Sequence, residues 1–441
     1  MATLTEGRPA GQPGGRPADR DFPLLYLVML TIAAGNTALQ SVMPAVGRLL
    51  QVGDLVVGIT FSFSALVWTI AAPAWARRSD RRGRKAMIGI GLSGFCLSMA
   101  LCGLALTAGL LGWIGPVAAF GCFILGRLVY GALGAAAPPA AQAVVAGRTS
   151  RADRTNALAM LASAFGLGTI IGPALAPFLL LPVVGMAGPA YIFVGVGIVV
   201  TLVVMRLLSN DGPMLDPGAR GANTSEPSIG GQPSGASVIA AANAPADGRI
   251  RLRDPRIWPW MVAGIIAGHA QAMTGQALAF LVMDQLRLPP TVAQPMIGTV
   301  LMAGAGAALL AQWGLIPRLG LGPRALILWG SAISALGCLA VPFATNVHAL
   351  AVAFAFASIG FGFLRPGFTA GASLAVGAGE QGVVAGKVTA VNGAVFVLGP
   401  SIGIGLYEIA PPLPYLVAAA ALVVLLAYTW RTLIPSIDRA E

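Results

Sequence analysis

Charged residues are scarce in this sequence. Asp, Glu, Lys and Arg make up 10% of its 441 residues, hydrophobic residues make up 56%, and the mean hydropathy is +0.81. So little polar surface could not cover a water-soluble fold of this size, which excludes an ordinary soluble protein. The uncharged runs are rich in Leu, Val, Ala and Gly and are longer than the roughly 10-residue alternating strands of a membrane barrel. The composition therefore predicts an all-α integral membrane protein.

Cysteine and histidine are also sparse, with four Cys and two His. The cysteines lie inside apolar runs without Cys-x-x-Cys spacing, so we interpret them as packing residues and expect neither a metal site nor a disulfide. No Ser/His/Asp set, metal-ligand cluster or phosphate-binding glycine loop occurs in the polar segments. We therefore expect no enzyme activity and no cofactor. The cysteines are Cys96, Cys102, Cys122 and Cys338.

The chain is instead filled with uncharged runs long enough to cross a bilayer, which takes about 20 mostly apolar residues per helix. Turn residues at 112–116, 181–189 and 342–346 divide the longest runs, which gives twelve spans. A stretch rich in Gly, Pro, Ser and Asn separates them into six and six and cannot bury enough apolar surface to fold. We expect a disordered cytoplasmic N-terminus at 1–20, six-helix bundles at 21–208 and 257–433, a flexible cytoplasmic linker at 209–256, and a cytoplasmic tail at 434–441.

Basic residues outnumber acidic ones, for a net charge of +11. With the N-terminus in the cytoplasm, all but four of the 27 Lys and Arg fall in cytoplasmic segments, which is the positive-inside bias of membrane proteins. Topology therefore explains the basicity, and we expect no nucleic-acid partner. Abundant Arg, Ala and Gly suit a GC-rich bacterial genome, so we place the chain in a bacterial inner membrane with both termini cytoplasmic. The four exceptions are Arg48, Arg127, Arg287 and Arg365.

The two halves show signs of an internal repeat. At an offset of 227 residues, Pro139 falls on Pro366, and Gly172-Pro173 falls on Gly399-Pro400. Twelve-span transporters are commonly built from two related halves that rock about a site near the bilayer midplane. We therefore expect two pseudo-symmetric six-helix bundles around a central cavity, and transport by alternating access.

The turn after the second span, "ARRSDRRGRK" at 76–85, concentrates charge between two uncharged runs. It resembles the loop between spans two and three of the major facilitator superfamily, although Ala76 replaces the first Gly of that pattern. Gly83 would permit a tight turn. The resemblance implies that Asp80 pairs with a motif Arg and faces the start of the eleventh helix, latching the bundles together; alternatively, Asp80 only offsets local repulsion. The matching residues are Asp80, Arg81, Gly83, Arg84 and Lys85.

Arg127 lies about one third of the way into the fourth span, where a cation is costly and is usually functional or partnered. The surrounding "GRLVYGALGAAAPP" resembles the family's fourth-span motif, Arg-x-x-Gln-Gly, with Tyr130 in place of Gln. The resemblance implies a link to proton coupling. The alternative is that Arg127 snorkels toward the headgroups and pairs with a neighbouring carbonyl.

The fifth span contains "GLGTIIGPALAP", which resembles the fifth-span motif of drug:H⁺ antiporters, a branch that includes tetracycline exporters. Gly168, Gly172 and Pro173 match, whereas Ala176 and Pro177 replace the final glycines. Glycines four residues apart allow close helix contact, and Pro173 bends the helix. Both properties suit a moving interface, and they suit a static packing seam equally.

A carboxylate is missing from the first span, where many drug antiporters carry one. If protons drive transport, another group must titrate, and His269 and Asp284 are the candidates beside Arg127. His269 has a suitable unperturbed pKa near 6.5, but it fits equally into a polar cluster with Gln271 and Gln276. For Asp284 the alternative is an interaction with Arg287 or with solvent.

Polar residues within the spans could line a substrate cavity. Arg365 either lines the cavity, where it would favour anionic or neutral substrates, or snorkels. With so few acids in the spans, a dicationic substrate is not expected. The candidates are Asn36, Gln40, Gln142, Gln271, Gln276, Arg365 and Asn392.

Together these features favour a monomeric, proton-coupled exporter of amphipathic drugs or small metabolites that works in the lipid bilayer. The alternative is a solute:H⁺ symporter for uptake on the same fold. A membrane sensor or scaffold would need a folded soluble domain, and the low-complexity linker offers none.

Overall fold

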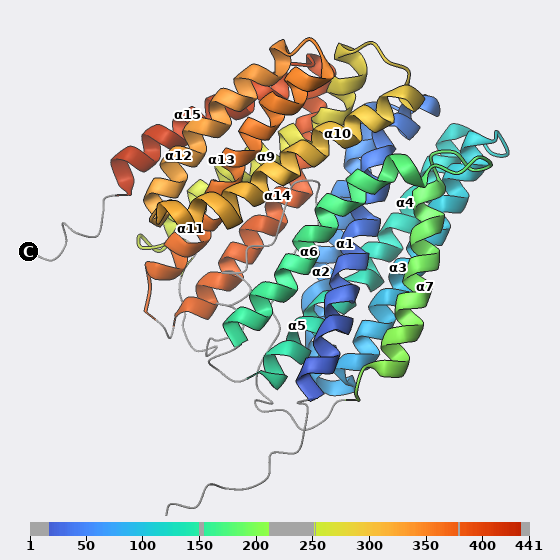
Figure 1. Ribbon diagram of the computed structural model, residues 1–441, viewed down its shortest axis with the longest axis horizontal. Helices are drawn as coiled ribbons and strands as arrows, with labels where there is room; N and C mark the ends of the chain where they lie inside the picture. Colours follow the sequence, from blue (N-terminus) through green and yellow to red (C-terminus); the bar gives the residue numbers. More distant parts are fainter. Residues whose placement is uncertain (1–16, 150–153, 211–250, 252, 378–379, 434–441) are drawn as a thin grey trace, which may run out of the picture.

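The computed structural model describes residues 17–149, 154–210, 251, 253–377 and 380–433, and these form an almost entirely helical protein (Figure 1). Within these ranges, β-structure is limited to one bridge between Leu181 and Gly185. Among the residues described, twelve helices are long and apolar enough to cross a membrane, as the hydropathy pattern predicts. The terminal segments and most of the linker expected at 209–256 lie outside the described residues.

The first half contributes six spans, and the fourth is interrupted by a 3₁₀ turn that precedes two prolines, Pro138 and Pro139. Proline has no amide hydrogen to donate within a helix, so regular hydrogen bonding is disturbed there. The elements are α1 (Pro17–Leu49), α2 (Asp54–Arg82), α3 (Arg84–Leu110), α4 (Pro116–Leu133) with η1 (Gly134–Ala136) and α5 (Ala137–Arg148), α6 (Arg154–Leu175) followed by η2 (Ala176–Leu179), and α7 (Gly188–Leu207).

The second half also contributes six spans, the second of which contains a π-helical turn. The elements are α9 (Trp258–Gln285), α10 (Pro290–Leu309) with η3 (Leu310–Leu315) and α11 (Ile316–Leu319), α12 (Pro323–Ala340) followed by η4 (Val341–Phe343), α13 (Val347–Leu374), α14 (Gln381–Ile409) and α15 (Leu413–Thr432).

The three turns expected inside the long apolar runs are all confirmed, because each separates two helices. Pro116 begins α4 after the first turn, and Pro189 lies in the first turn of α7 after the second. At the third, the side chain of Asn346 accepts a hydrogen bond of 2.9 Å from the backbone N–H of Ala349 and caps α13. Local turn chemistry therefore sets where these spans begin.

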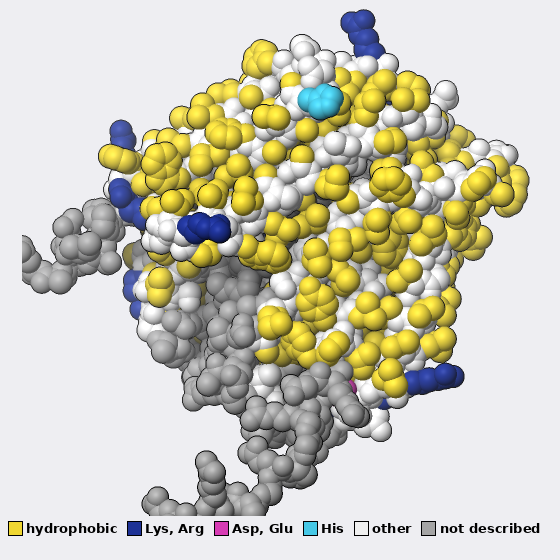
Figure 2. Space-filling view, in the orientation of Figure 1, with side chains coloured by type: hydrophobic (Ala, Val, Ile, Leu, Met, Phe, Trp, Pro, Cys, Tyr) yellow, Lys and Arg dark blue, Asp and Glu magenta, His cyan; other side chains and the backbone are white. Residues whose placement is uncertain are grey.

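Large apolar side chains cover the outside of the helices. Val117, Phe178 and Ile409 are at least three-quarters exposed, and Figure 2 shows a mostly apolar face with few charged side chains. A water-soluble protein avoids apolar patches of this extent, whereas lipid accommodates them. The surface therefore agrees with twelve helices embedded in a bilayer.

The helices form two bundles, blue to green and yellow to red in Figure 1, which meet at one end of the molecule and separate at the other. We name these the closed end, where α1 is followed by α2 at residues 48–55, and the open end, where α2 is followed by α3 at residues 82–84. At the closed end a single hydrophobic core includes residues of both halves. A second core contains residues of the second half only and lies toward the open end. The second-half members of the shared core lie at 277–283, 293–301 and 341–354 and at Ile404, Tyr407 and Tyr415.

Candidate functional site

Ion pairs at the closed end cross from one bundle to the other. Arg48, at the end of α1, donates hydrogen bonds of 2.8 Å from Nη2 to Asp54 of α2 and to Asp284 of α9. The hydroxyl of Tyr407 on α14 donates to Asp284 at 2.5 Å, and the Arg48 guanidinium lies over the Phe280 ring. We call Arg48, Asp54, Asp284 and Tyr407 the closed-end cluster. It links four helices of both halves through charge-assisted hydrogen bonds.

Three further contacts hold the halves together in the same region. The side chain of Glu408 accepts a 2.8 Å hydrogen bond from the backbone N–H of Leu55, in the first turn of α2, where the helix dipole favours an anion. The hydroxyls of Ser62 and Ser401 lie 2.7 Å apart. Gln294 of α10, which is fully buried, donates from Nε2 to the carbonyl of Ser41 on α1 at 3.4 Å.

The closed-end cluster corrects one interpretation of the sequence. The Asp284 carboxylate meets Arg48 and Tyr407 rather than Arg287, its neighbour in sequence. The predicted topology held a usable signal, because Arg48, Asp54 and Asp284 all fall at the same end of their spans. Their pairing nevertheless depends on helix rotation, which the hydropathy pattern leaves open.

At the open end, the side-chain ion pairs of the described residues stay within one bundle. In the first half, Arg148 at the end of α5 pairs with Asp21 near the start of α1. In the second half, Arg256 donates hydrogen bonds to Asp254 and, from Nη1 at 2.8 Å, to Glu380 just before α14. These hydrogen bonds hold the pKa of Asp254 and of Glu380 below the usual range. Ion pairs of the described residues thus connect the two bundles at the closed end and stay within a single bundle at the open end.

The turn "ARRSDRRGRK" has the tight geometry expected of it. Gly83 separates α2 from α3 with φ = 90°, a conformation that a side chain disfavours. Buried Arg84 donates to the carbonyl of Ala143 in α5, and Lys85 Nζ donates to the carbonyl of Leu208, just after α7, at 2.6 Å. The side chains of Asp80 and Arg81 lie outside the described residues, so the latch remains a prediction.

Arg127 is fully buried inside the first bundle. Its guanidinium lies 5.0 Å from the centre of the Phe61 ring and 4.6 Å from that of Tyr130, and its Nη2 donates to Ser64 Oγ at 3.3 Å. Complete burial contradicts the alternative in which Arg127 snorkels toward the headgroups. Its environment consists of aromatic rings and a hydroxyl of α2 and α4, with cation–π attraction compensating part of the desolvation.

The glycines of the fifth span allow close contact between helices. A Cβ at Gly172 would lie 2.3 Å from the carbonyl oxygen of Ala34, and one at Gly168 would lie 2.6 Å from that of Leu30, both in α1. On another side, the Pro173 carbonyl oxygen lies 3.3 Å from where a Cβ of Gly298, on α10, would be. The helix therefore packs within its own bundle through the glycines and touches the other bundle beside Pro173.

His269 lies on α9 and is half-buried. Its Nδ1 is 2.8 Å from the carbonyl oxygen of Ile265, one helical turn earlier. That contact favours the tautomer in which Nδ1 carries the proton and donates a hydrogen bond to the carbonyl. Among the described residues, no three His, Cys, Asp or Glu side chains gather where they could share a metal ion.

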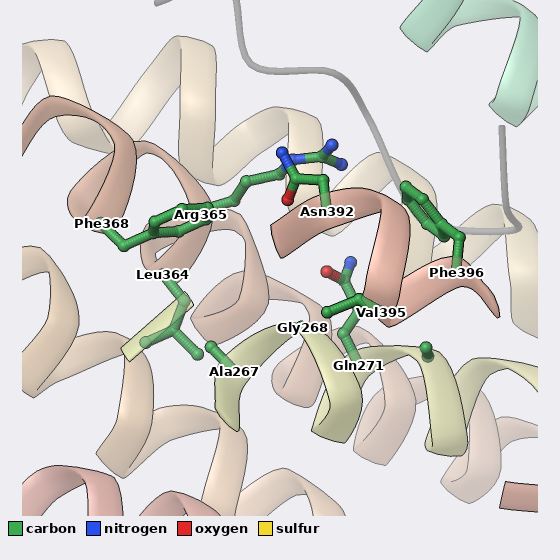
Figure 3. A pocket seen from close by; sticks show the side chains of 10 residues that line it. Ala267, Gly268, Gln271, Leu364, Arg365, Phe368, Asn392, Val395 and Phe396 are labelled. Carbon is green, nitrogen blue, oxygen red and sulfur yellow. The ribbon is translucent and has the colours of Figure 1, made fainter. Parts of the chain in front are cut away.

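A pocket in the second half brings three of the predicted cavity residues together (Figure 3). Gln271 comes from α9, Arg365 from α13 and Asn392 from α14, and Phe368 and Phe396 form part of the apolar lining. Gln271 also borders a second pocket between α9, α10 and α13. These two pockets combine amide groups, one cation and aromatic rings, a mixture common in sites for small organic molecules.

The other four candidates lie elsewhere. Asn36 and Gln40 are buried on α1, Gln142 is buried on α5, and Gln276 is buried on α9, outside both pockets. Within the described structure, neither amide atom of Gln142 has a hydrogen-bond partner. Sequence reasoning missed Gln294, whose contact with Ser41 joins the bundles.

Relatives of known name match part of the chain. It is 34% identical over 148 residues to the tetracycline resistance protein, class B, of Escherichia coli, which covers 34% of this chain and 33% of that protein. It is 30% identical over 138 residues to multidrug resistance protein 2 of Bacillus subtilis, covering 31% and 32% of the two chains. The aligned region spans about a third of the length of these relatives.

Solved structures match nearly the whole fold. A bacterial homologue of the iron transporter ferroportin in its inward-facing state has a TM-score of 0.67 at 15% identity, covering 94% of this chain and 98% of that one. Such a homologue in its outward-facing state has a TM-score of 0.60 at 14% identity, covering 94% and 99%. The family model described as Major Facilitator Superfamily matches residues 25–321, well over half of the sequence. From this match, the twelve helices and the shared architecture, we conclude that the chain belongs to the Major Facilitator Superfamily.

Proposed function

We propose that this protein is a proton-coupled exporter of amphipathic drugs or small metabolites that works by alternating access. The observation that carries the proposal is the difference between its two ends. At the closed end the bundles share a hydrophobic core and the closed-end cluster, whereas the second core and the open-end ion pairs belong to single bundles. Two bodies joined at one end only are what a rocking transporter requires. The partial likeness to tetracycline and multidrug resistance proteins supports export.

The charge distribution supports an orientation. The turn at 76–85 and the open-end arginines lie on the side that the positive-inside bias assigns to the cytoplasm. The conformation described here would then face inward, with its closed end toward the outside of a bacterial inner membrane. We propose that a single copy is the working unit, because the contacts that join the two bundles at the closed end all lie within one chain.

Of the three proton-coupling candidates, His269 fits a carrier best. Asp284 is part of the closed-end cluster, so in this conformation it is paired with Arg48 and remote from the open end. Arg127 is enclosed by the Phe61 and Tyr130 rings and does not line the pocket. His269 follows Gly268, which lines the pocket with Gln271 and Arg365, and proton transfer is a common role of histidine.

Transport direction and coupling can be measured together. The protein would be expressed in an efflux-deficient bacterium, and accumulation of fluorescent and antibiotic compounds would be recorded before and after an uncoupler collapses the proton gradient. We expect accumulation to fall, and the uncoupler to abolish the effect. Export that resists the uncoupler would refute proton coupling, and increased accumulation would identify an uptake symporter instead.

A further inference from the structure

Arg365 carries a charge that the described acidic side chains leave without a counter-ion. We propose that Arg365, with Gln271 and Asn392, binds the anionic group of an amphipathic substrate, so that the exported compounds include singly charged organic anions with an apolar body. This inference rests on the proposed transport function and names the substrate class of the same cavity. It concerns equilibrium binding, which can be tested separately from transport.

The described acidic side chains all have partners at a distance from Arg365. Every acidic side chain that the structure describes is engaged away from Arg365: Asp21 by Arg148, Asp54 and Asp284 by Arg48, Asp254 and Glu380 by Arg256, and Glu408 by the Leu55 amide. Arg365 lies in the interior of α13, within a membrane-length helix. An uncompensated cation at such a position is unfavourable and commonly marks a substrate or ion pathway. A bound anion would supply the missing charge.

The pocket places hydrogen-bonding groups around the Arg365 side chain. The guanidinium carbon of Arg365 lies 5.8 Å from the centre of the Phe396 ring, and its buried Nε has no hydrogen-bond partner in the structure. Figure 3 shows the Arg365 side chain extending toward Asn392, with Gln271 reaching up from α9. A carboxylate or phosphate there would meet one guanidinium and amide groups that can donate hydrogen bonds.

Apolar side chains near Arg365 suit the uncharged body of the substrate. The pocket is also lined by Phe368, Val395 and Phe396, and Gln271 borders the second pocket, which Phe354 and Phe361 line. An aromatic or aliphatic body could therefore lie against apolar side chains while its anionic group meets Arg365. Among the described residues, Arg365 is the one charged side chain lining either pocket, so the complementary ligand carries a single negative charge.

The test uses three probes of the same shape, naphthoate, naphthamide and naphthylmethylammonium, which differ in charge. Their dissociation constants would be measured by equilibrium dialysis on the full chain in phosphatidylcholine nanodiscs. We expect the wild type to bind naphthoate about 10-fold more tightly than naphthamide, as a charge-assisted hydrogen bond would predict, and the cation most weakly. Equal affinity for naphthoate and naphthamide in the wild type would overturn the proposal without any variant.

Variants then assign the preference to Arg365. Arg365→Gln should lower naphthoate affinity to that of naphthamide and leave naphthamide binding unchanged, and Arg365→Lys should retain part of the preference. Arg324→Gln is the matched control, because Arg324 also lies over an aromatic ring, that of Trp430, but outside both pockets. A naphthoate preference that survives in a folded Arg365→Gln protein would refute the assignment. If Arg365→Gln does not fold, the other two variants decide. The assignment to Arg365 would be refuted if Arg324→Gln loses the preference for naphthoate over naphthamide while Arg365→Lys retains it.

The anion could come from a solute or from a lipid headgroup, and the bilayer composition separates the two. If phosphatidylglycerol in the nanodisc weakens naphthoate binding in the wild type and not in Arg365→Gln, the pocket accepts the lipid headgroup; unchanged binding assigns it to solutes. Arg365-dependent binding without uncoupler-sensitive efflux would refute the export function and leave the anion site standing. Efflux without any charge preference in binding would do the reverse.

Discussion

Corresponding spans of the two halves each carry an arginine away from the span ends, and the two side chains lie in different surroundings. Arg127, in the fourth span, lies between the Phe61 and Tyr130 rings and donates to Ser64. Arg365, in the tenth span, lines a pocket. The first arginine is enclosed by its own bundle, and the second is available to a ligand. Under the proposed anion binding, equivalent spans of the repeated fold would take a structural role in one half and a binding role in the other.

The comparison extends to the helices that touch both bundles. In the first half, α6 packs on α1 through Gly168 and Gly172; in the second, α14 packs on α9, where a Cβ at Gly403 would lie 2.6 Å from the Met273 Cα. Here the halves are alike, because both seams place a glycine against the neighbouring backbone. The two halves therefore share the close glycine contacts of α6 with α1 and of α14 with α9, and they differ in the surroundings of Arg127 and Arg365.

The largest effect should come from filling a seam. We expect Gly172→Val to lower the free energy of unfolding by about 3 kcal/mol, because a side chain would meet backbone atoms that cannot move aside. Gly403→Val should cost a similar amount in the second half. Thermal unfolding of the purified variants measures both, with Gly195→Val as control, since a Cβ there would meet nothing within 4 Å. A tolerant seam in one half would break the proposed equivalence.

Neutralising the two arginines should change the free energy of unfolding by different amounts. We expect Arg127→Met to lower the free energy of unfolding by about 2 kcal/mol, because it removes desolvated cation–π contacts. Arg365→Met should leave stability unchanged or raise it, since it removes a charge that no described acid compensates. Melting temperatures in the absence of substrate give the comparison. Equal losses would show that both arginines are structural.

The closed-end cluster should influence the conformational equilibrium rather than the fold. Arg48 and Asp284 are partly exposed, so we expect Arg48→Gln to weaken closure by about 1 kcal/mol, or roughly 5-fold in population. Ile404 is buried against Gly58 of the other bundle, so the thiol of an Ile404→Cys variant should then react faster with a membrane-impermeant maleimide. Arg287→Gln is the control, and an equal increase there would restore the pairing suggested by the sequence.

The smallest effect concerns pH at the open end. Arg256 holds the pKa of Glu380 and Asp254 below 4.5 and 3.8, so its stabilisation is present above those values and is lost as the pH falls through the lowered ones. The melting temperature of Arg256→Gln should be slightly lower than that of the wild type near pH 7 and should converge with it as the pH falls below the lowered pKa values of the two carboxyl groups. A difference that persists in acid would assign another role to Arg256.

Sequence information was sufficient for the spans because hydropathy and turn residues act locally. The turns at 112–116, 181–189 and 342–346 separate helices as predicted, and the spacing of Gly168 and Gly172 indicated close packing. Partners distant in sequence could not be predicted, because they depend on how each helix is rotated. The sequence suggests that Asp284 interacts with Arg287, three residues away, whereas its carboxylate contacts Arg48, 236 residues away. Likewise, only Gln271, Arg365 and Asn392 of the seven cavity candidates share a pocket.

The closed-end cluster also bears on the rate of turnover. Arg48 contacts two carboxylates, Asp54 in its own bundle and Asp284 in the other, and Asp284 also accepts a hydrogen bond from Tyr407, which belongs to its own bundle. In the proposed alternating-access cycle, each charge would keep a partner from its own bundle when the bundles part. The activation barrier for opening would then not include the cost of leaving a partly buried charge unpaired. A gate of this kind would close firmly and still reopen in every cycle.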